Sequence, residues 1–236
     1  MWESFEKFHA KCRASRYLRV FSWLVRLALA AGFIPSGMVK ILGERFTALP
    51  DYHPMGAYLE ALHHTGWYYT SIGVFQVLAA LLLLIPRTAV LGLFIYLPII
   101  LNITLLSLSV RFDGSLVTAP LMVVACLFLL LWHFEQWKFI LPPFQKLTSP
   151  KPAEAPNWKW NLAMTGIGVL VVVGMASWSI FGFEVLPRNK YEYCLKQCPE
   201  LDNTEACEAF CDCVHIDQHK WKDCIANYNN HEDETD

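Results

Sequence analysis

Residues 67–110, WYYTSIGVFQVLAALLLLIPRTAVLGLFIYLPIILNITLLSLSV, form the stretch that decides the fold of this chain. Segments 67–85 and 88–110 carry no charged side chain, and each is long enough to cross about 30 Å of hydrocarbon as a helix. Pro86 and Arg87 separate them, because proline cannot continue a helix and arginine is costly in lipid. We therefore predict two antiparallel membrane helices joined by a tight turn.

Three further apolar segments, at residues 20–42, 116–137 and 160–183, are also long enough to span a membrane. The first is long for a signal peptide and contains Arg26, so we expect it to remain uncleaved. Together the five segments predict an all-α, polytopic membrane bundle with a four-helix core and a fifth span. The expected organisation is a cytoplasmic N-terminal segment at 1–19, the four-helix bundle at 20–140, a cytoplasmic loop at 141–159, the fifth transmembrane helix at 160–183, and a cysteine-rich periplasmic module at 187–236.

The composition agrees with a lipid environment. Of the 236 residues, 55% are hydrophobic and 17% are charged, whereas soluble domains carry about 25% charged residues. The formal net charge of −2 gives no indication of a nucleic-acid partner. The charge is unevenly distributed, because residues 187–236 hold 12 of the 21 acidic and 5 of the 19 basic residues. The tail therefore carries −7 and the remainder carries +5.

Basic residues near the ends of the spans predict the orientation, since they concentrate on the cytoplasmic side. The basic residues on one side are Lys7, Lys11, Arg13, Arg16, Arg19, Arg87, Lys138, Lys146, Lys151 and Lys159. The opposite loops between spans hold only Arg45 and Arg111. We expect a bacterial inner-membrane protein whose N-terminus is cytoplasmic and whose C-terminus is periplasmic.

The first apolar segment carries a family resemblance. It reads RLALAAGFIPSGMVKIL from Arg26 to Leu42, with a small-residue stretch and the ending Gly37-Met-Val-Lys40. In these features residues 17–140 resemble the DoxX-like family of small bacterial membrane proteins. The short turn at Pro86 is also similar to that family, as is the Leu-Trp ending of the fourth segment.

The resemblance implies a four-helix bundle for residues 17–140. It also implies a relation to proteins of which some are subunits of a thiosulfate:quinone oxidoreductase. Others are linked to thiol redox balance or to maturation of periplasmic redox enzymes. The family supplies no catalytic signature that could be carried over to residues of this chain.

Four polar residues at membrane depth are candidate ligand-binding residues: Arg26, Lys40, Gln76 and Asn102. Arg26 and Lys40 could each reach the nearer membrane surface, or one could face the bundle interior and bind an anionic or quinone head group. Gln76 and Asn102 lie at similar depth on neighbouring helices, so we predict a hydrogen bond between them. That pair could act as structural glue or contact a quinone carbonyl.

Polar residues outside the spans allow fewer conclusions. Residues 54–64 of the outer loop can form a short interfacial helix, on which Glu60 and His64 stand four residues apart. At that spacing they could share a proton or a metal ion, or belong to a solvated helix face. His133 and Glu135 are interpreted as boundary residues at the inner end of the fourth span.

The tail contains six of the eight cysteines: Cys194, Cys198, Cys207, Cys211, Cys213 and Cys224. On the outer side of a bacterial membrane an even number indicates disulfides, for which fifteen pairings are possible. Two Cys-x3-Cys pairs, each on one helix face, predict an antiparallel helical hairpin. The hairpin would join Cys198 to Cys207 and Cys194 to Cys211, and would leave Cys213 to bond Cys224.

Two other uses of the tail cysteines stay open. Cys211 and Cys213 are close enough in sequence to form a redox-active pair. His215 and His219 could complete a zinc site with cysteines, particularly if the tail were inside the cell. Cys12 and Cys126 are interpreted as a free thiol and a small apolar residue.

Two functional hypotheses follow. The first is a non-catalytic anchor or accessory subunit, whose bundle presents the disulfide-stapled module to a periplasmic or membrane protein partner. The second is a quinone-linked membrane redox subunit acting on thiols or sulfur compounds, with the four polar residues around the quinone head group. A polar pocket joining those four residues would favour the second hypothesis, and a fully packed bundle the first.

Overall fold

The computed structural model describes residues 2–47, 49–50, 52–138, 158–182 and 184–233, and within these ranges the chain forms helices and connecting turns without any strand. Up to the predicted fifth span the helices are α1 (Trp2–Ala14), α2 (Arg16–Ile41), α3 (Pro54–His63), α4 (Trp67–Leu84), α5 (Ala89–Ser109), α6 (Thr118–Trp132), α7 (Phe134–Trp137) and α8 (Trp158–Phe181). The C-terminal module follows as α9 (Tyr191–Leu195), the 3₁₀ helix η3 (Cys198–Glu200), α10 (Thr204–His215) and α11 (Trp221–Asp233). Of the loop predicted at 141–159, residues 141–157 lie outside the described residues.

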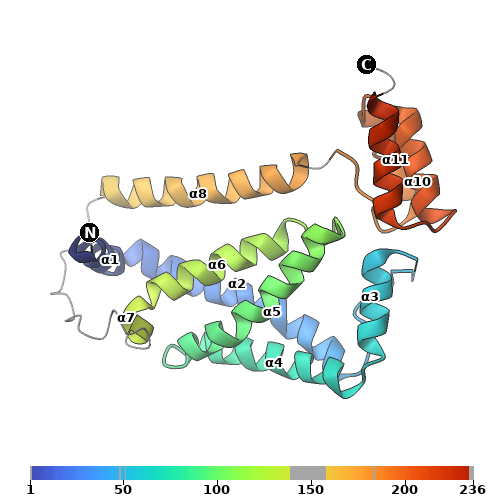
Figure 1. Ribbon diagram of the computed structural model, residues 1–236. Coiled ribbons are helices and arrows are strands. Elements are labelled where there is room, and N and C mark those ends of the chain that lie inside the picture. Colours follow the sequence, from blue (N-terminus) through green and yellow to red (C-terminus); the bar gives the residue numbers. More distant parts are fainter. Residues whose placement is uncertain (1, 48, 51, 139–157, 183, 234–236) are drawn as a thin grey trace.

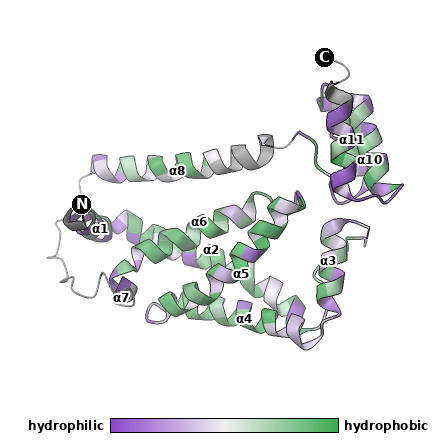
Figure 2. Ribbon diagram, viewed as in Figure 1, coloured by the Kyte–Doolittle hydropathy of each residue, from purple (hydrophilic) through white to green (hydrophobic). Residues whose placement is uncertain are grey.

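Three helices of the described chain, α2, α4 and α5, are long and apolar enough to cross a membrane. Hydrophobic residues predominate along α4, α5 and α6 in Figure 2. Large apolar side chains also point outward from the bundle, including Phe75 and Leu105, and lipid, unlike water, does not penalise their exposure. The fold class predicted from the sequence, an all-helical membrane protein with a disulfide-bonded module, is confirmed.

The fourth apolar helix is shorter than the segment predicted at residues 116–137. Helix α6 ends at Trp132, where His133 leaves the helical conformation and its N–H donates to the Leu129 carbonyl at 3.0 Å. The chain then forms the short α7. The helix predicted at residues 160–183 is present as α8 and begins earlier than expected, at Trp158.

Helices α2 and α4 approach closely because two glycines meet at their crossing. A Cβ atom on Gly37 would lie 2.8 Å from the Gly73 carbonyl oxygen, and one on Gly73 would lie 2.6 Å from the Gly37 carbonyl oxygen. Within a membrane, helices gain little from excluding water from one another, so close backbone packing supplies much of the association energy. The α2–α4 contact therefore sets the geometry of the bundle.

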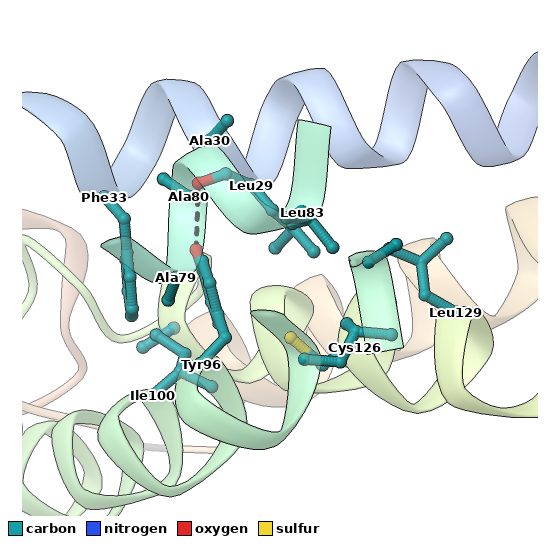
Figure 3. Packing of buried hydrophobic residues seen from close by; sticks show 13 residues of the cluster. Leu29, Ala30, Phe33, Ala79, Ala80, Leu83, Tyr96, Ile100, Cys126 and Leu129 are labelled. Carbon is teal, nitrogen blue, oxygen red and sulfur yellow. Dashed lines mark hydrogen bonds between the residues drawn. The ribbon is translucent and has the colours of Figure 1, made fainter. Parts of the chain in front are cut away.

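Helix α5 completes the bundle core through Tyr96 (Figure 3). Its ring stacks on Phe33 with centroids 3.5 Å apart, and its hydroxyl donates to the Leu29 carbonyl of α2 at 3.0 Å. The buried hydroxyl is thus satisfied, as low-dielectric surroundings require. Cys126 of α6 is fully buried in the same cluster. This position agrees with the interpretation of Cys126 as a small apolar residue.

The helices place two sets of connections at opposite ends of the bundle (Figure 1). One end holds α1, α7 and the turn at Pro86, and the other holds α3 and the C-terminal module. Helix α8 runs beside the bundle from the first end to the second. Its start is fixed by Ser15, whose hydroxyl donates to the Asn161 side-chain oxygen at 2.7 Å.

Candidate functional site

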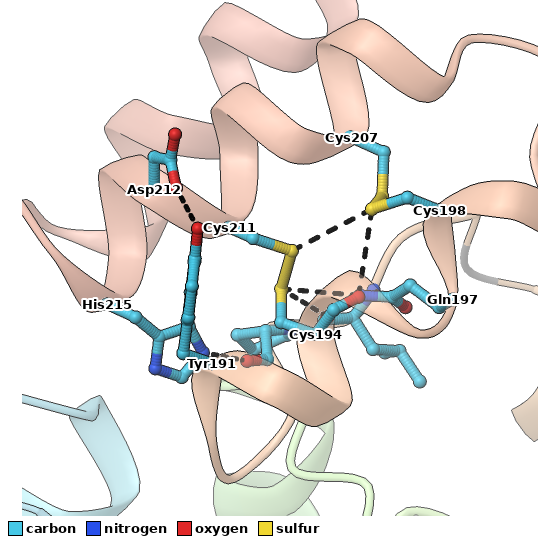
Figure 4. Close-up of a disulfide and its surroundings, with 10 residues drawn as sticks. Tyr191, Cys194, Gln197, Cys198, Cys207, Cys211, Asp212 and His215 are labelled. Atoms are coloured by element: carbon cyan, nitrogen blue, oxygen red, sulfur yellow. Dashed lines mark hydrogen bonds between the residues drawn. A yellow bond between two sulfur atoms is a disulfide. The ribbon is translucent and has the colours of Figure 1, made fainter.

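The C-terminal module is a helical hairpin closed by three disulfides. The pairs are Cys194–Cys211, Cys198–Cys207 and Cys213–Cys224. These are the pairs predicted from the spacing, and they follow because cysteines four residues apart occupy one face of each helix. Figure 4 shows the first two pairs side by side, between α10 and the segment from α9 to η3.

The disulfides leave the module no thiol for other chemistry. Cys211 and Cys213 are each bonded to another cysteine, so the alternative redox-active pair between them is not formed. The alternative zinc site is not formed either, because a disulfide sulfur is not a thiolate ligand. His215 instead directs its Nε2 to the Pro187 carbonyl at 2.7 Å. The cysteines here serve the structure of the module.

The start of α10 is fixed by a side-chain cap. The Asn203 side-chain oxygen accepts a hydrogen bond from the Ala206 N–H at 3.0 Å, which satisfies one of the unpaired donors of the first turn. Gln197 ties the entering chain to the hairpin, because its side-chain amide donates to the Leu186 carbonyl and accepts from the Leu186 N–H. The module is therefore ordered from its entry point.

A cleft of about 460 Å³ opens between α10 and α11. Its lining includes the buried rings of Phe210 and Tyr228 together with exposed polar side chains. The residues lining the cleft are Ala206, Ala209, Phe210, Cys213, Asp217, His219, Cys224, Asn227, Tyr228 and Asn230. The cleft is open and mostly polar, so it suits a polar surface of another molecule better than a small apolar ligand.

The module also contacts the end of the bundle. Arg188 forms an ion pair with Asp113 of the α5–α6 connection, with Nη1 3.3 Å from Oδ2. The Arg111 guanidinium lies 5.5 Å from the ring centroid of Trp221 in α11. The partners come from segments far apart in sequence, and these contacts join the module to the end of the bundle.

Two buried histidines lie within this docking interface. His53 is fully buried at the start of α3, and its Nδ1 accepts a hydrogen bond from the Met55 N–H at 3.2 Å. Burial, together with the neighbouring His215, lowers the pKa of His53 to about 4, against a partial opposing effect of Asp113. Burial also lowers the pKa of His215. Both imidazoles are therefore neutral at neutral pH.

Lys40 and Gln76 meet at Ser36, near the end of the bundle that carries α3. Lys40 Nζ donates to the Ser36 hydroxyl at 2.9 Å, and Gln76 Nε2 donates to the same oxygen at 3.3 Å. The predicted hydrogen bond between Gln76 and Asn102 is wrong. Gln76 turns toward α2, where the Gly37–Gly73 contact brings α4 close, and Asn102 is exposed on α5.

Arg26 lies at the other end of the bundle and is only 4% exposed. Its Nη2 is hydrogen-bonded to His133 Nε2, and its guanidinium lies 5.1 Å from the ring centroid of Trp23. Arg26 therefore does not reach out to the membrane surface, and His133 is its partner rather than a simple boundary residue. Nearby, Lys138 is fully buried and pairs with Glu135 at 2.7 Å.

The four candidate ligand-binding residues do not converge. Lys40 and Gln76 are together, but Arg26 is separated from Lys40 by about 21 Å along α2. Asn102 faces outward. Sequence reasoning missed Ser36, although a serine four residues before a membrane-embedded lysine could have indicated an internal partner for the ammonium group.

Comparisons with known proteins give one informative similarity. No family model and no solved structure matches the chain. The chain is 37% identical over 122 residues to the protein of Bacillus subtilis (strain 168) called "Uncharacterized protein YwoB". The match covers 49% of this chain and 77% of that protein.

Proposed function

The chain belongs to the same family as the uncharacterized protein YwoB, and we propose from its own architecture that it is an inner-membrane anchor or accessory subunit. In this role the bundle holds the disulfide-bonded module at its periplasmic end, and the module's α10–α11 cleft binds a protein partner. The observation that carries the proposal is a cleft lined by module residues alone, in a module that contacts the end of the bundle.

The burial of the module's disulfides supports a binding role over a redox role. All six of its cysteines are in disulfides and five of the six are fully buried, so a thiol from outside has poor access and their contribution is rigidity. Rigid surfaces lose less conformational entropy on association. The tail carries a formal charge of −7, so a partner with a basic contact surface would be favoured electrostatically.

The proposed orientation rests on the distribution of basic residues. Helix α1, which carries Lys7 and Lys11, and the α4–α5 turn, which carries Arg87, lie at the bundle end opposite the module. Such basic residues concentrate on the cytoplasmic side. The oxidising compartment outside the membrane is also where disulfides persist. Relationship to the DoxX-like proteins remains part of this proposal, supported by the Arg26–Lys40 motif.

The binding role can be tested by site-specific photo-crosslinking in native membranes. A photoreactive amino acid replaces Ala209 or Asn227, which line the cleft and are exposed, or Ala226, which is exposed on the same helix as Asn227 but outside the cleft. We expect one discrete protein adduct from the two cleft positions and none from Ala226. Failure of both cleft positions to form an adduct would remove the support for a protein partner.

A quinone-linked function is the second candidate, and the surroundings of Arg26 favour it. Among the described residues, the guanidinium Nε and Nη1 of this buried side chain have no hydrogen-bond partner, so they could donate to a quinone carbonyl. A bound quinone would supply two-electron redox chemistry.

Organic extraction of the purified protein tests for quinone binding at Arg26, because wild type should yield quinone and Arg26→Gln should yield much less. Absence of quinone from wild type would contradict it.

A further inference from the structure

The last turn of α3 brings together one carboxylate and two imidazoles. One ligand atom each from Glu60, His63 and His64 lies within 4.8 Å of the other two. The clustering follows from the helix, since residues three and four positions after Glu60 return to the same face. From this arrangement we propose that Glu60, His63 and His64 bind a Zn²⁺ ion at the bundle end that carries the module.

Neighbouring groups already orient two of the three side chains. Arg45 Nε lies 2.7 Å from Glu60 Oε2, which leaves Oε1 directed to His64 Nε2 at 2.9 Å. His63 Nε2 lies 3.0 Å from the Gly43 carbonyl oxygen. Metal-binding sites commonly hold their ligands through such outer hydrogen bonds to carbonyls and charged groups.

The backbone around the cluster is shaped to make these contacts. Gly43 follows α2 and has a φ of 73°, a left-handed conformation that glycine adopts without strain, and its carbonyl reaches His63 of α3. The ring of Tyr69 on α4 packs edge-on against His63 at 5.3 Å, and its hydroxyl donates to the Glu44 carbonyl at 2.9 Å. The cluster therefore stands on three connected elements and not on a single solvated helix.

The ligand set indicates the class of metal. Two imidazole nitrogens and one carboxylate oxygen suit Zn²⁺, which takes a fourth ligand from water in sites of this kind. Magnesium and calcium prefer oxygen ligands throughout. His64 is 72% exposed, so a hydrated ion can reach the site directly. The positive charge of the Arg45 guanidinium repels a Zn²⁺ ion at this site. We therefore expect moderate rather than very tight Zn²⁺ binding.

The test is Zn²⁺ titration of the metal-stripped, full-length protein in detergent, with a chromophoric chelator as competitor. We expect a site of one Zn²⁺ per chain that weakens at least about tenfold in His63→Gln and in His64→Gln. His219→Gln is the matched control, because His219 is also exposed but lies in the module cleft. It should leave the affinity unchanged.

Two results would overturn the proposal. Zn²⁺ affinity that is the same in wild type, His63→Gln and His64→Gln would show that the cluster is only an ion-pair network. Loss of binding in His219→Gln alone would place the metal in the module. Because His64 is exposed, its substitution should not disturb folding, which an unchanged metal-free melting temperature would verify. The outcome is independent of the photo-crosslinking result, since none of the three ligands lines the cleft.

Discussion

The bundle and the C-terminal module solve the same problem, holding helices together, by different physical means. The bundle uses close backbone contact at Gly37 and Gly73 and a core that includes Tyr96. The module has a small hydrophobic cluster around Phe210 and Tyr228 and adds three disulfides. Close packing stabilises long helices in lipid, whereas a short chain in water needs covalent links to stay folded. The two regions should therefore respond to different perturbations.

Breaking disulfides should give the largest and most localised effect. Replacing Cys194 and Cys211 together by serine removes a link that typically contributes about 2–5 kcal/mol to a small domain. We expect amide exchange to become fast through α9, α10 and α11 while α2 and α4 stay protected. Cys12→Ser, at a free cysteine, is the control and should change neither region. Loss of protection in α2 and α4 would contradict the independence of the two regions.

Crowding the glycine contact should damage the bundle instead. In Gly73→Ala the new Cβ meets the Gly37 backbone carbonyl, which cannot rotate away, and we expect destabilisation of about 1–3 kcal/mol. Gly168→Ala in α8 is the matched control, because a Cβ there meets nothing within 4 Å. Thermal unfolding in detergent measures both variants. Equal melting temperatures for Gly73→Ala and wild type would show that α2 and α4 have room to separate.

Low pH should weaken the docking of the module on the bundle. The pKa of His53 is lowered from 6.5 to about 4, so the docked state binds fewer protons than the undocked state. Docking is therefore strongest above pH 6.5, and its stability falls progressively as the pH drops from 6.5 toward 4. The groups facing His53 are His215, Asp113, Arg188 and Phe112. The rate of amide exchange at residues 111–115 measures how far the module undocks.

A non-titrating substitution isolates this effect. Asparagine at position 53 can still accept the Met55 N–H, because it is a good helix-capping residue. His53→Asn should thus keep α3 folded and reduce the pH dependence of exchange, leaving the part due to His215. A pH profile identical to that of wild type would show that His53 does not control docking.

The smallest expected effect is at the interface ion pair. Arg188 and Asp113 are partly exposed, so their pair should contribute about 1 kcal/mol or less and should weaken with salt. Asp113→Asn keeps the size of the side chain while removing its charge. We expect slightly faster exchange at residues 111–115 in low salt and no difference from wild type in high salt. A large effect in high salt would require another role for Asp113.

The sequence was most informative where local spacing controls structure. The Cys-x3-Cys pairs predicted the hairpin and its disulfides, because both depend on helical period alone. The apolar lengths likewise predicted the helices now seen as α2, α4 and α5. Helix α6 was predicted too long, since apolar residues continue past His133, where the cap ends the helix.

Contacts between helices were less predictable, because depth in the membrane does not specify rotation about the helix axis. Gln76 and Asn102 were matched by depth, yet Gln76 faces Ser36 on α2 and Asn102 faces outward. The Arg26–His133 hydrogen bond joins residues 107 positions apart, and nothing local indicates it. Such pairs depend on how α2, α4 and α6 pack.

The proposed function requires that the disulfide-closed module stands outside the membrane, on the end of the bundle. The most direct test is labelling of intact cells with a membrane-impermeant maleimide, before and after an impermeant reductant. We expect no labelling of the six module cysteines before reduction and labelling of all six afterwards, with Cys126 unlabelled throughout because it is buried. Prompt labelling without reductant, or none after it, would rule out a disulfide-closed module outside the membrane.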